Sequence, residues 1–339
     1  MPTDHAAPPL RNGCCRRCFV AIAAAGLGAA CGAAEPAGKA DGKEPPPGPE
    51  AITLQTTDGL ELRAWVYRVA ADADPLATVL LLHDLGGSHE SVEPLAKALQ
   101  VGGCNVVAPD LRGHGKSQIP DLARRAGAAG QSNLLKSADF AAMAATGGGR
   151  VRAQAATRGD VEVVRNWIKQ QANQGTLDLD RLFVVGSGLG ATVGATWTAL
   201  DAAWPPIASG PQGGQVRGLV MIDPAMVAKG FPITKPLATE PLRSNLPIMV
   251  IAGGEDDDAG KVFEQLKRAR PSGWYDSRKV DAEQRSNTSP AKDSEASLVF
   301  VKLGGKLAGD KLAAARAADP RQPDPAKLIL TFIETADDR

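Results

Sequence analysis

The sequence predicts an α/β domain with a mostly parallel central sheet and helices on both faces. Largely apolar runs of strand length at residues 78–82 and 105–108 are separated by segments of helical character. A helical apolar stripe at residues 161–168 follows Asp160, the expected N-cap, and Asp324 precedes the proline that would open a closing helix. Strands that alternate with helices favour parallel pairing within one sheet.

The first 50 residues differ from the rest in composition. Arg16 and Arg17 precede an apolar stretch at residues 19–30, which fits a twin-arginine export signal and is shorter than the about 20 residues of a membrane span. Cys31 ends a Gly-Ala-Ala-Cys sequence similar to a lipobox, so lipidation at Cys31 and plain signal-peptidase cleavage both stay open. A Pro/Gly-rich tether follows at 32–50.

We therefore expect a signal peptide at residues 1–31, a linker at 32–50 and one domain at 51–339. The protein would be an exported bacterial protein, periplasmic or at the cell surface, with a lipid anchor to the membrane as one option.

Charge and cysteine content narrow the classes of partner. Lys+Arg 38 balances Asp+Glu 38, so the chain has no net field that would attract nucleic acid. Cys104 is the only cysteine after Cys31, which excludes an intrachain disulfide in the domain, and we expect it to be buried and inert. Cys14, Cys15 and Cys18 fall within the predicted signal, so we expect no metal site, and nothing else requires a cofactor.

Three loops that follow predicted strands carry recognisable sequences. They read HDLGGS at residues 83–88, PDLRGHGKS at 109–117 and GSGLG at 186–190. On these motifs the chain resembles the α/β-hydrolase superfamily, in particular its serine aminopeptidase, lysophospholipase and dienelactone-hydrolase-like branches. The resemblance covers about residues 52–335 and implies an α/β-hydrolase fold. Only 22 residues, 224–245, occupy the usual site of a cap domain, so we expect no full cap.

The resemblance also fixes which residue of the third loop would be the nucleophile. In the family's G-x-S-x-G turn the middle residue attacks the substrate, and here Gly186 and Gly190 fit the outer positions. Gly188 therefore stands where the serine should be, and Ser187 lies one residue early. Because working relatives hold serine in this turn, we expect Gly188→Ser to be tolerated.

The remaining catalytic positions follow from the same resemblance. Asp257 corresponds to the triad acid, and Lys306 lies where the base should follow the last strand. No histidine occurs after His114. The backbone N–H groups of Leu85 and Leu189 correspond to the oxyanion hole.

These positions predict that Ser-His-Asp hydrolysis has been lost, because a serine hydroxyl needs a nearby imidazole to remove its proton. The first hypothesis is therefore a pseudoenzyme that acts as a binding or scaffolding protein for a small-molecule or protein ligand. A second is an active ester or peptide hydrolase in which Ser187 works with a base such as His83 or His114. Lys306 is a weaker candidate base, since lysine must be desolvated to lose its proton near neutral pH.

A third hypothesis is a dinucleotide-binding enzyme. The sequence from Gly186 to Ala191 also fits G-x-G-x-x-A, with Asp223 at the end of the next predicted strand. Asp223 follows Gly186 by considerably more than the usual spacing of about 20 residues, which weakens this hypothesis.

Two segments exceed a minimal domain of this class. We expect solvated loops at residues 119–158, with one short helix at 134–145, and at 271–295. Trp204, Trp274 and Tyr275 are candidate contact residues outside the core.

Overall fold

The structure is a computed structural model that describes residues 45–127, 130–146, 159–204, 213–254, 257–279, 296–317 and 323–337. One compact unit comprises Glu44–Arg339. The predicted signal peptide and most of the predicted linker lie outside the described residues. None of the helices in the described ranges is both long and apolar enough to span a bilayer.

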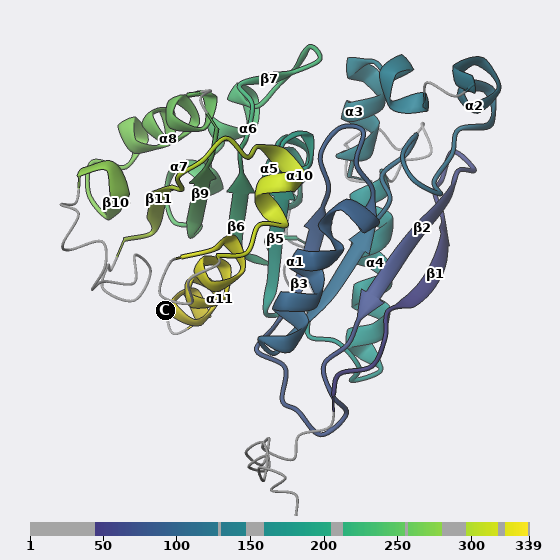
Figure 1. The fold of residues 1–339 in the computed structure, drawn as a ribbon, viewed down its shortest axis with the longest axis horizontal. Helices are drawn as coiled ribbons and strands as arrows, with labels where there is room; N and C mark the ends of the chain where they lie inside the picture. The colour runs from purple at the N-terminus through teal and green to yellow at the C-terminus, as the bar shows by residue number, and fades with distance from the viewer. Residues whose placement is uncertain are drawn as a thin grey trace, which may run out of the picture. The chain divides into compact units, whose positions relative to one another are not determined.

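Nine strands form the central sheet, in the order β1-β2-β4-β3-β5-β6-β9-β11-β10 (Figure 1). β1 pairs antiparallel with β2, and β2 with β4, whereas all other neighbours are parallel. The predicted, mostly parallel sheet is confirmed. The strands are β1 Glu50–Gln55, β2 Glu61–Tyr67, β3 Ala77–Leu82, β4 Cys104–Pro109, β5 Leu182–Ser187, β6 Val216–Ile222, β9 Ile248–Ala252, β10 Trp274–Asp276 and β11 Leu298–Lys302.

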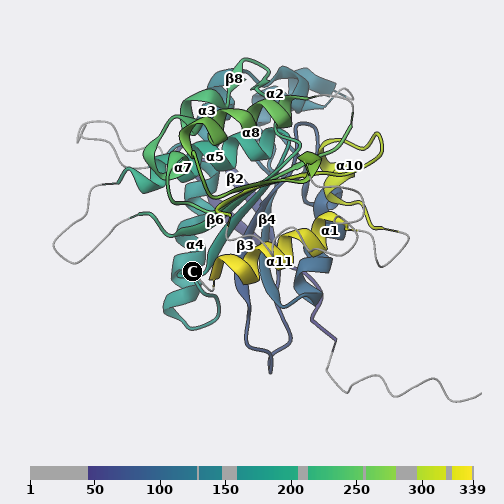
Figure 2. The same cartoon turned by 90° about the vertical axis from the view of Figure 1, so that its left-hand side faces the viewer.

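Helices cover both faces of the sheet, as the alternation of strands and helices predicts (Figure 2). One face packs against α1, α10 and α11, and the other against α3, α4, α5 and α8. The helices are α1 His89–Val101, α2 Pro120–Ala126, α3 Ser137–Met143, α4 Asp160–Asn173, α5 Leu189–Ala202, α6 Thr234–Leu237, α7 Glu240–Arg243, α8 Asp258–Ala269, α10 Gly309–Ala313 and α11 Pro325–Asp337.

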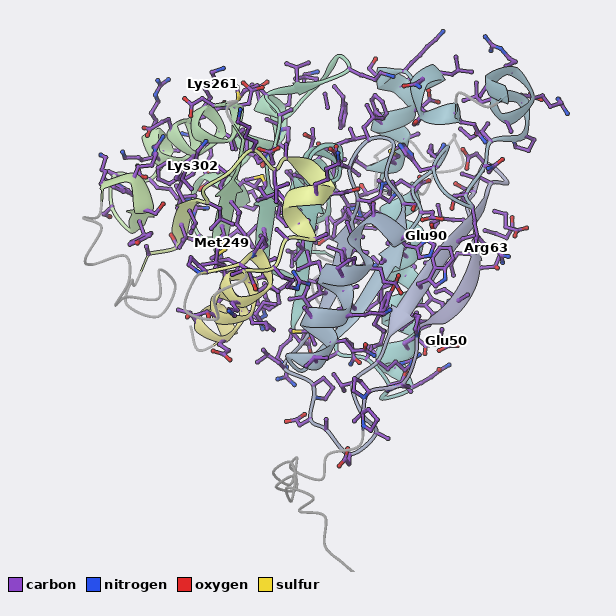
Figure 3. The ribbon with its side chains drawn as sticks, viewed as in Figure 1. Glu50, Arg63, Glu90, Met249, Lys261 and Lys302 are labelled. Carbon is purple, nitrogen blue, oxygen red and sulfur yellow. The ribbon has the colours of Figure 1, made fainter. Side chains whose placement is uncertain are left out.

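The core divides into two layers because successive strand residues point to opposite faces. In β5, Leu182 and Val184 join the layer under α4 and α5, whereas Phe183 and Val185 join the layer under α1 and α11. Met249 of the inner strand β9 is wholly buried, whereas Glu50 of the edge strand β1 is exposed (Figure 3). The central strands are therefore apolar on both faces, as the apolar runs predict.

Two of the predicted helix starts have different outcomes. Asp324 caps α11 as expected, since its Oδ1 accepts the Lys327 N–H at 2.9 Å. The N-cap of α4 is Gly159 rather than Asp160, which is the first helical residue and is fully buried. Asp160 is held there because its carboxylate pairs with Arg112.

Cys104 in β4 is buried, and burial raises the pKa of its thiol to about 12.

The two segments predicted as solvated loops contain more structure than expected. In the first, α2, a 3-10 helix at Gln131–Leu134 and α3 replace the single predicted helix, and Phe140 and Met143 are buried. In the second, β10 pairs parallel with β11. Trp274 is half-buried in this strand, with the Lys267 ammonium 4.0 Å from its ring centroid, so packing explains the aromatic residue. Trp204 is also half-buried, and its indole nitrogen is buried.

The segment between β6 and β9 is small. It forms a two-stranded hairpin, β7 Val227–Ala228 with β8 Phe231–Pro232, followed by α6 and α7. Figure 1 shows the hairpin at the same end of the sheet as the carboxyl ends of the strands. These short elements occupy the position where a larger cap would be inserted.

The loop at residues 109–117 is fixed by buried charges. Asp110 accepts the His89 N–H through Oδ1 and the Lys116 N–H through Oδ2, both at 2.7 Å. Arg112 donates from its backbone N–H and its guanidinium to Asp160, at 2.7 to 2.9 Å. Asp110 and Arg112 therefore stabilise the conformation of this loop through buried hydrogen bonds.

Candidate functional site

The site lies where the strand order changes direction. From β3 the chain continues to β4 on one side, and it later reaches β5 on the other side of β3. In open α/β sheets, ligands bind beyond the carboxyl ends of strands at such a switch point. The loop after β3 and the turn after β5 meet there.

The turn after β5 has the geometry of a nucleophile elbow. Gly188 follows the strand with φ 49° and ψ −113°, a conformation that strongly favours glycine, and α5 begins immediately after it. A Cβ on Gly186 would overlap the carbonyl of Gly190, and one on Gly190 would lie 2.5 Å from the carbonyl of His83. The close approach of strand and helix thus requires the two outer glycines, which places Gly188 at the apex of the motif, where it is buried.

The carboxylate of Asp84 fills the space beside this apex. Its Oδ1 accepts the Leu189 N–H at 2.8 Å and the Leu85 N–H at 2.6 Å. These are the two amides that the resemblance assigns to the oxyanion hole. A Cβ on Gly188 would overlap the same carboxylate oxygen. Asp84 therefore places a carboxyl group of the protein itself where a hydrolase stabilises the negative charge of its reaction intermediate.

Two further carboxylates lie around Asp84. Asp310, at the start of α10, accepts the Asp84 backbone N–H at 2.8 Å and the Ser91 hydroxyl at 2.5 Å. Asp223, which follows β6 with a φ of 50°, accepts the Gly309 N–H at 2.9 Å. We call Asp84, Asp223 and Asp310 the acidic cluster.

Two members of the acidic cluster, Asp84 and Asp310, have raised pKa values. Burial raises the pKa of Asp84, and the neighbouring charges of Asp310 and Asp223 raise it further, against the two amide hydrogen bonds. Burial also raises the pKa of Asp310, against hydrogen bonds that include those from Ser91 and Asp84. In the described part of the chain, no group of three or more His, Cys, Asp or Glu side chains is arranged to hold a metal ion.

Both residues assigned to the acid and base positions are exposed to solvent. Lys306 is exposed in the turn after β11, and the residue that this C-terminal connection brings to the elbow is Asp310. Asp257 is exposed at the N-cap of α8, where its carbonyl accepts the Lys261 N–H. The carboxylate that lies beside the elbow is instead that of Asp223, which follows β6.

The two candidate histidines differ in their bonding. His83 has both ring nitrogens engaged, Nδ1 at 2.7 Å from the Asp84 carbonyl and Nε2 accepting the Leu111 N–H at 3.0 Å. His114 is bonded through Nδ1 to the Arg112 carbonyl, whereas its buried Nε2 has no hydrogen-bond partner. Burial lowers the pKa of His114 to about 4, so its ring is neutral at pH 7.

Ser187 does not form the dyad with His83 that the sequence left open. Its hydroxyl is fully buried at the end of β5 and has no hydrogen bond of normal geometry. It lies near enough to Asp310 to lower the pKa of that carboxyl. The structure thus places Ser187 beside a carboxylate, and the nitrogens of His83 are used elsewhere.

A cavity of about 220 Å³ opens beside the site. Gly86 and Gly87 of the loop after β3, and Gly113, His114 and Gly115 of the loop after β4, form one side of it. Because four of these five residues are glycines, backbone atoms and the His114 ring line this side of the cavity. Sequence reasoning named His114 for this region but assigned no role to Asp84, in the loop between β3 and α1, or to Asp310, in the first turn of α10.

Comparisons with known proteins concern the family and the fold. The model of the family described as "Alpha/beta hydrolase family" matches residues 79–339. No curated protein sequence matches the chain. Among solved structures, the chain is similar to DcsB in complex with its substrate analogue, at 12% identity and a TM-score of 0.51, covering 86% of this chain and 99% of that one.

Two further solved structures are similar at comparable levels. A dienelactone hydrolase from Anabaena variabilis ATCC 29413 is 13% identical, with 77% of this chain and 87% of that chain covered and a TM-score of 0.48. A hyperthermophilic esterase from the archaeon Pyrobaculum calidifontis is 17% identical, with 86% and 83% covered and a TM-score of 0.49. Since the family match spans most of the sequence, the chain belongs to the alpha/beta hydrolase family.

Proposed function

We propose that this protein is a binding or scaffolding protein on an α/β-hydrolase fold that does not perform Ser-His-Asp hydrolysis. The observation that carries the proposal is the bonding of Asp84 to both Leu85 and Leu189. A hydrolase needs these donors for the oxyanion that develops during reaction. Here they are engaged by a carboxylate in the resting protein, and Gly188 beside them has no side chain to attack a substrate.

The surrounding groups support the same conclusion. A triad base must reach the nucleophile with a free imidazole nitrogen, and both nitrogens of His83 are engaged within the fold. Lys306 is exposed to solvent, whereas a lysine that acts as a base needs a desolvated site. The acidic cluster also disfavours a second negative charge at the elbow.

The ligand chemistry of the site follows from the groups around the elbow. The half-buried Asp84 and Asp310 carboxylates lie beside the elbow, and His114, whose Nε2 has no hydrogen-bond partner, lines the neighbouring cavity. All three groups accept hydrogen bonds from a donor. A ligand that presents N–H or O–H groups, or a positive charge, complements this site better than an acyl ester does. The acidic residues thus convert an anion-stabilising site into one suited to donors.

The first prediction concerns hydrolysis itself. We expect the full-length chain to hydrolyse p-nitrophenyl acetate no faster than the heat-denatured protein, and to remain unlabelled by a fluorophosphonate probe. Loss of the triad alone would leave a residual acceleration of about 10³-fold to 10⁴-fold from the oxyanion hole and substrate binding. Because Asp84 engages both donors, this residual rate should also be lost.

The control for this prediction tests the alternative that Ser187 acts as a displaced nucleophile. If the protein is labelled and Ser187→Ala abolishes the labelling while Ser132→Ala does not, Ser187 is an active nucleophile and the proposal is wrong.

The dinucleotide alternative meets a different obstacle. The Leu189 N–H at the start of α5, which would bind the pyrophosphate, donates to Asp84 instead.

We also propose that the protein is exported and tethered to a membrane through Cys31. The support comes from the sequence: Arg16 and Arg17 precede a short apolar segment, and Cys31 is followed by a Pro/Gly-rich spacer. A diacyl anchor at that position would hold the domain at the membrane surface without a spanning helix, since two acyl chains bury far more apolar surface than one.

Cell fractionation tests the tether. We expect the wild-type protein in the membrane fraction and Cys31→Ala in the soluble fraction, with Cys18→Ala as a control that behaves like the wild type. An identical distribution of Cys31→Ala and the wild type would disprove lipidation at Cys31. Replacement of Arg16 and Arg17 by lysine should block export in either case.

A further inference from the structure

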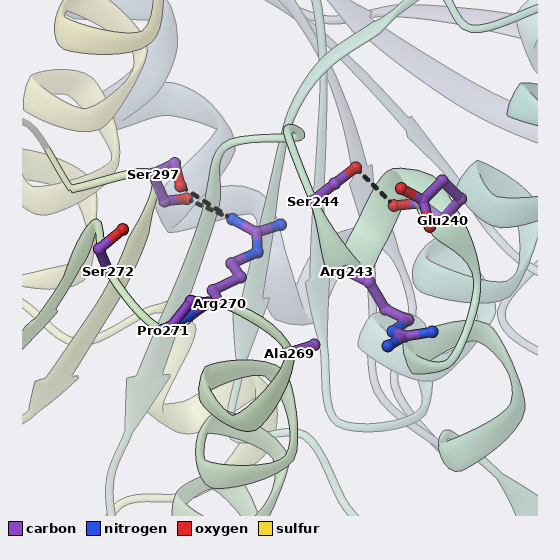
Figure 4. Close-up of a pocket in the computed structure, with 8 residues that line it drawn as sticks. All are labelled: Glu240, Arg243, Ser244, Ala269, Arg270, Pro271, Ser272 and Ser297. Carbon is purple, nitrogen blue, oxygen red and sulfur yellow. Dashed lines mark hydrogen bonds between the residues drawn. The ribbon is translucent and has the colours of Figure 1, made fainter.

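A second pocket lies at the opposite end of the strands from the elbow. Arg270 follows α8 as its C-cap, and Ser297 directly precedes β11. Both therefore lie at the amino ends of the strands, whereas Gly188 lies at a carboxyl end. The pocket has a volume of about 310 Å³ (Figure 4).

The guanidinium of Arg270 forms the inner wall of this pocket. It is only 4% exposed. One terminal nitrogen donates to the carbonyl and hydroxyl oxygens of Ser297, at 3.0 and 3.2 Å, and the other to the carbonyls of Leu242 and Leu246, at 2.7 and 2.8 Å. The Nε–H is buried and has no hydrogen-bond partner. Arg270 thus joins α7, α8 and β11, yet one of its five donors stays unsatisfied.

The positive charge of Arg270 is also uncompensated. Of the three buried arginines that the structure describes, Arg112 contacts Asp160 and Asp58, and Arg165 lies within 4 Å of carboxylates. Arg270 forms no ion pair with any described residue, and burial lowers its pKa to about 10. A buried charge is costly unless it is paired, so this guanidinium is poised for an anion.

The rest of the pocket offers further donors. Arg243 is exposed on the wall formed by α7, and Ser272 is exposed on the wall opposite (Figure 4). Guanidinium and hydroxyl groups bind phosphate and carboxylate oxygens with charge-assisted hydrogen bonds. Glu240 on the α7 wall carries the one negative side chain among the described lining residues.

We propose that this pocket binds a small oxyanion, a phosphate or carboxylate group, between the Nε–H of Arg270 and the guanidinium of Arg243. The bound oxygen would satisfy the orphaned donor and neutralise the buried charge. This site is separate from the elbow and independent of whether the protein hydrolyses esters.

Thermal unfolding of the full-length chain tests the site with inorganic phosphate and with acetate, at ionic strength matched by chloride. A ligand that binds the folded state raises the unfolding midpoint in a saturable way. Phosphate also stabilises proteins by exclusion from their surface, so a matched control is needed. Arg268→Gln supplies it, because Arg268 is exposed on α8 and does not line the pocket.

We expect the wild type and Arg268→Gln to show the same saturable rise, and Arg243→Gln to need about fivefold to tenfold more anion. Glu240→Gln should need less. The order of phosphate and acetate affinities identifies which group the site prefers. If neither anion gives a saturable rise, or if Arg243→Gln and Arg268→Gln respond identically, Arg270 serves only as a structural clamp and the proposal is overturned.

Discussion

Replacing Gly188 with serine should destabilise the protein by about 3 kcal/mol or more, measured by urea unfolding. Two effects contribute. A side chain at φ 49° and ψ −113° is strained, and its Cβ would overlap the Asp84 carboxylate. To make room, Asp84 would have to give up its hydrogen bonds from Leu85 and Leu189 and leave two amides without their partner.

Gly127 offers a matched control for the strain. It has φ 51° and ψ −136°, close to the values at Gly188, but a Cβ there would meet no atom within 4 Å. Gly127→Ser should therefore cost about 1 to 3 kcal/mol, the strain alone. In a double-mutant cycle, Asp84→Ala should recover at least about 1 kcal/mol of the loss in Gly188→Ser. Equal costs for the two serine variants would contradict the role given to Asp84.

This expectation reverses the one drawn from the sequence. The G-x-S-x-G pattern indicates that serine fits the turn, and it gives no information on which side chain from another loop occupies the space above it. Asp84 is 104 residues away from Gly188 in the chain, so only the packing of β3 beside β5 shows the overlap. Gly188 and Asp84 are therefore structurally coupled, since a side chain at position 188 would overlap the Asp84 carboxylate.

The fold was more predictable than the site for a physical reason. Buried parallel strands and amphipathic helices leave local periodic patterns, which is why the runs that became β3 and β4 could be located directly. The acidic cluster combines residues that follow β3 and β6 with one that begins α10, and no local pattern links them. Motif spacing assigned the base position to Lys306 and gave no signal for Asp310, because spacing along the chain does not fix the path of the turn between them.

Buried charge pairs also escape local patterns, and the pair of Arg112 and Asp160 should give the second large effect. Asp160→Ala should destabilise the protein by about 3 to 5 kcal/mol, because it leaves the guanidinium of Arg112 buried with only its contact to Asp58. Asp160 is fully buried and accepts three hydrogen bonds from Arg112, including one from the backbone N–H of the 109–117 loop. Urea unfolding at neutral pH measures the cost.

The same guanidinium supplies the control. Asp58 accepts one hydrogen bond from Arg112 at 2.8 Å, but its side chain is 40% exposed, so Asp58→Ala should cost less than about 1 kcal/mol. The double variant Arg112→Met with Asp160→Leu should recover much of the stability, since apolar side chains of similar size need no partner. If Asp58→Ala proved as costly as Asp160→Ala, the exposed carboxylate would be the true counter-ion of Arg112. The 109–117 loop would then be anchored to the β1–β2 turn rather than to α4.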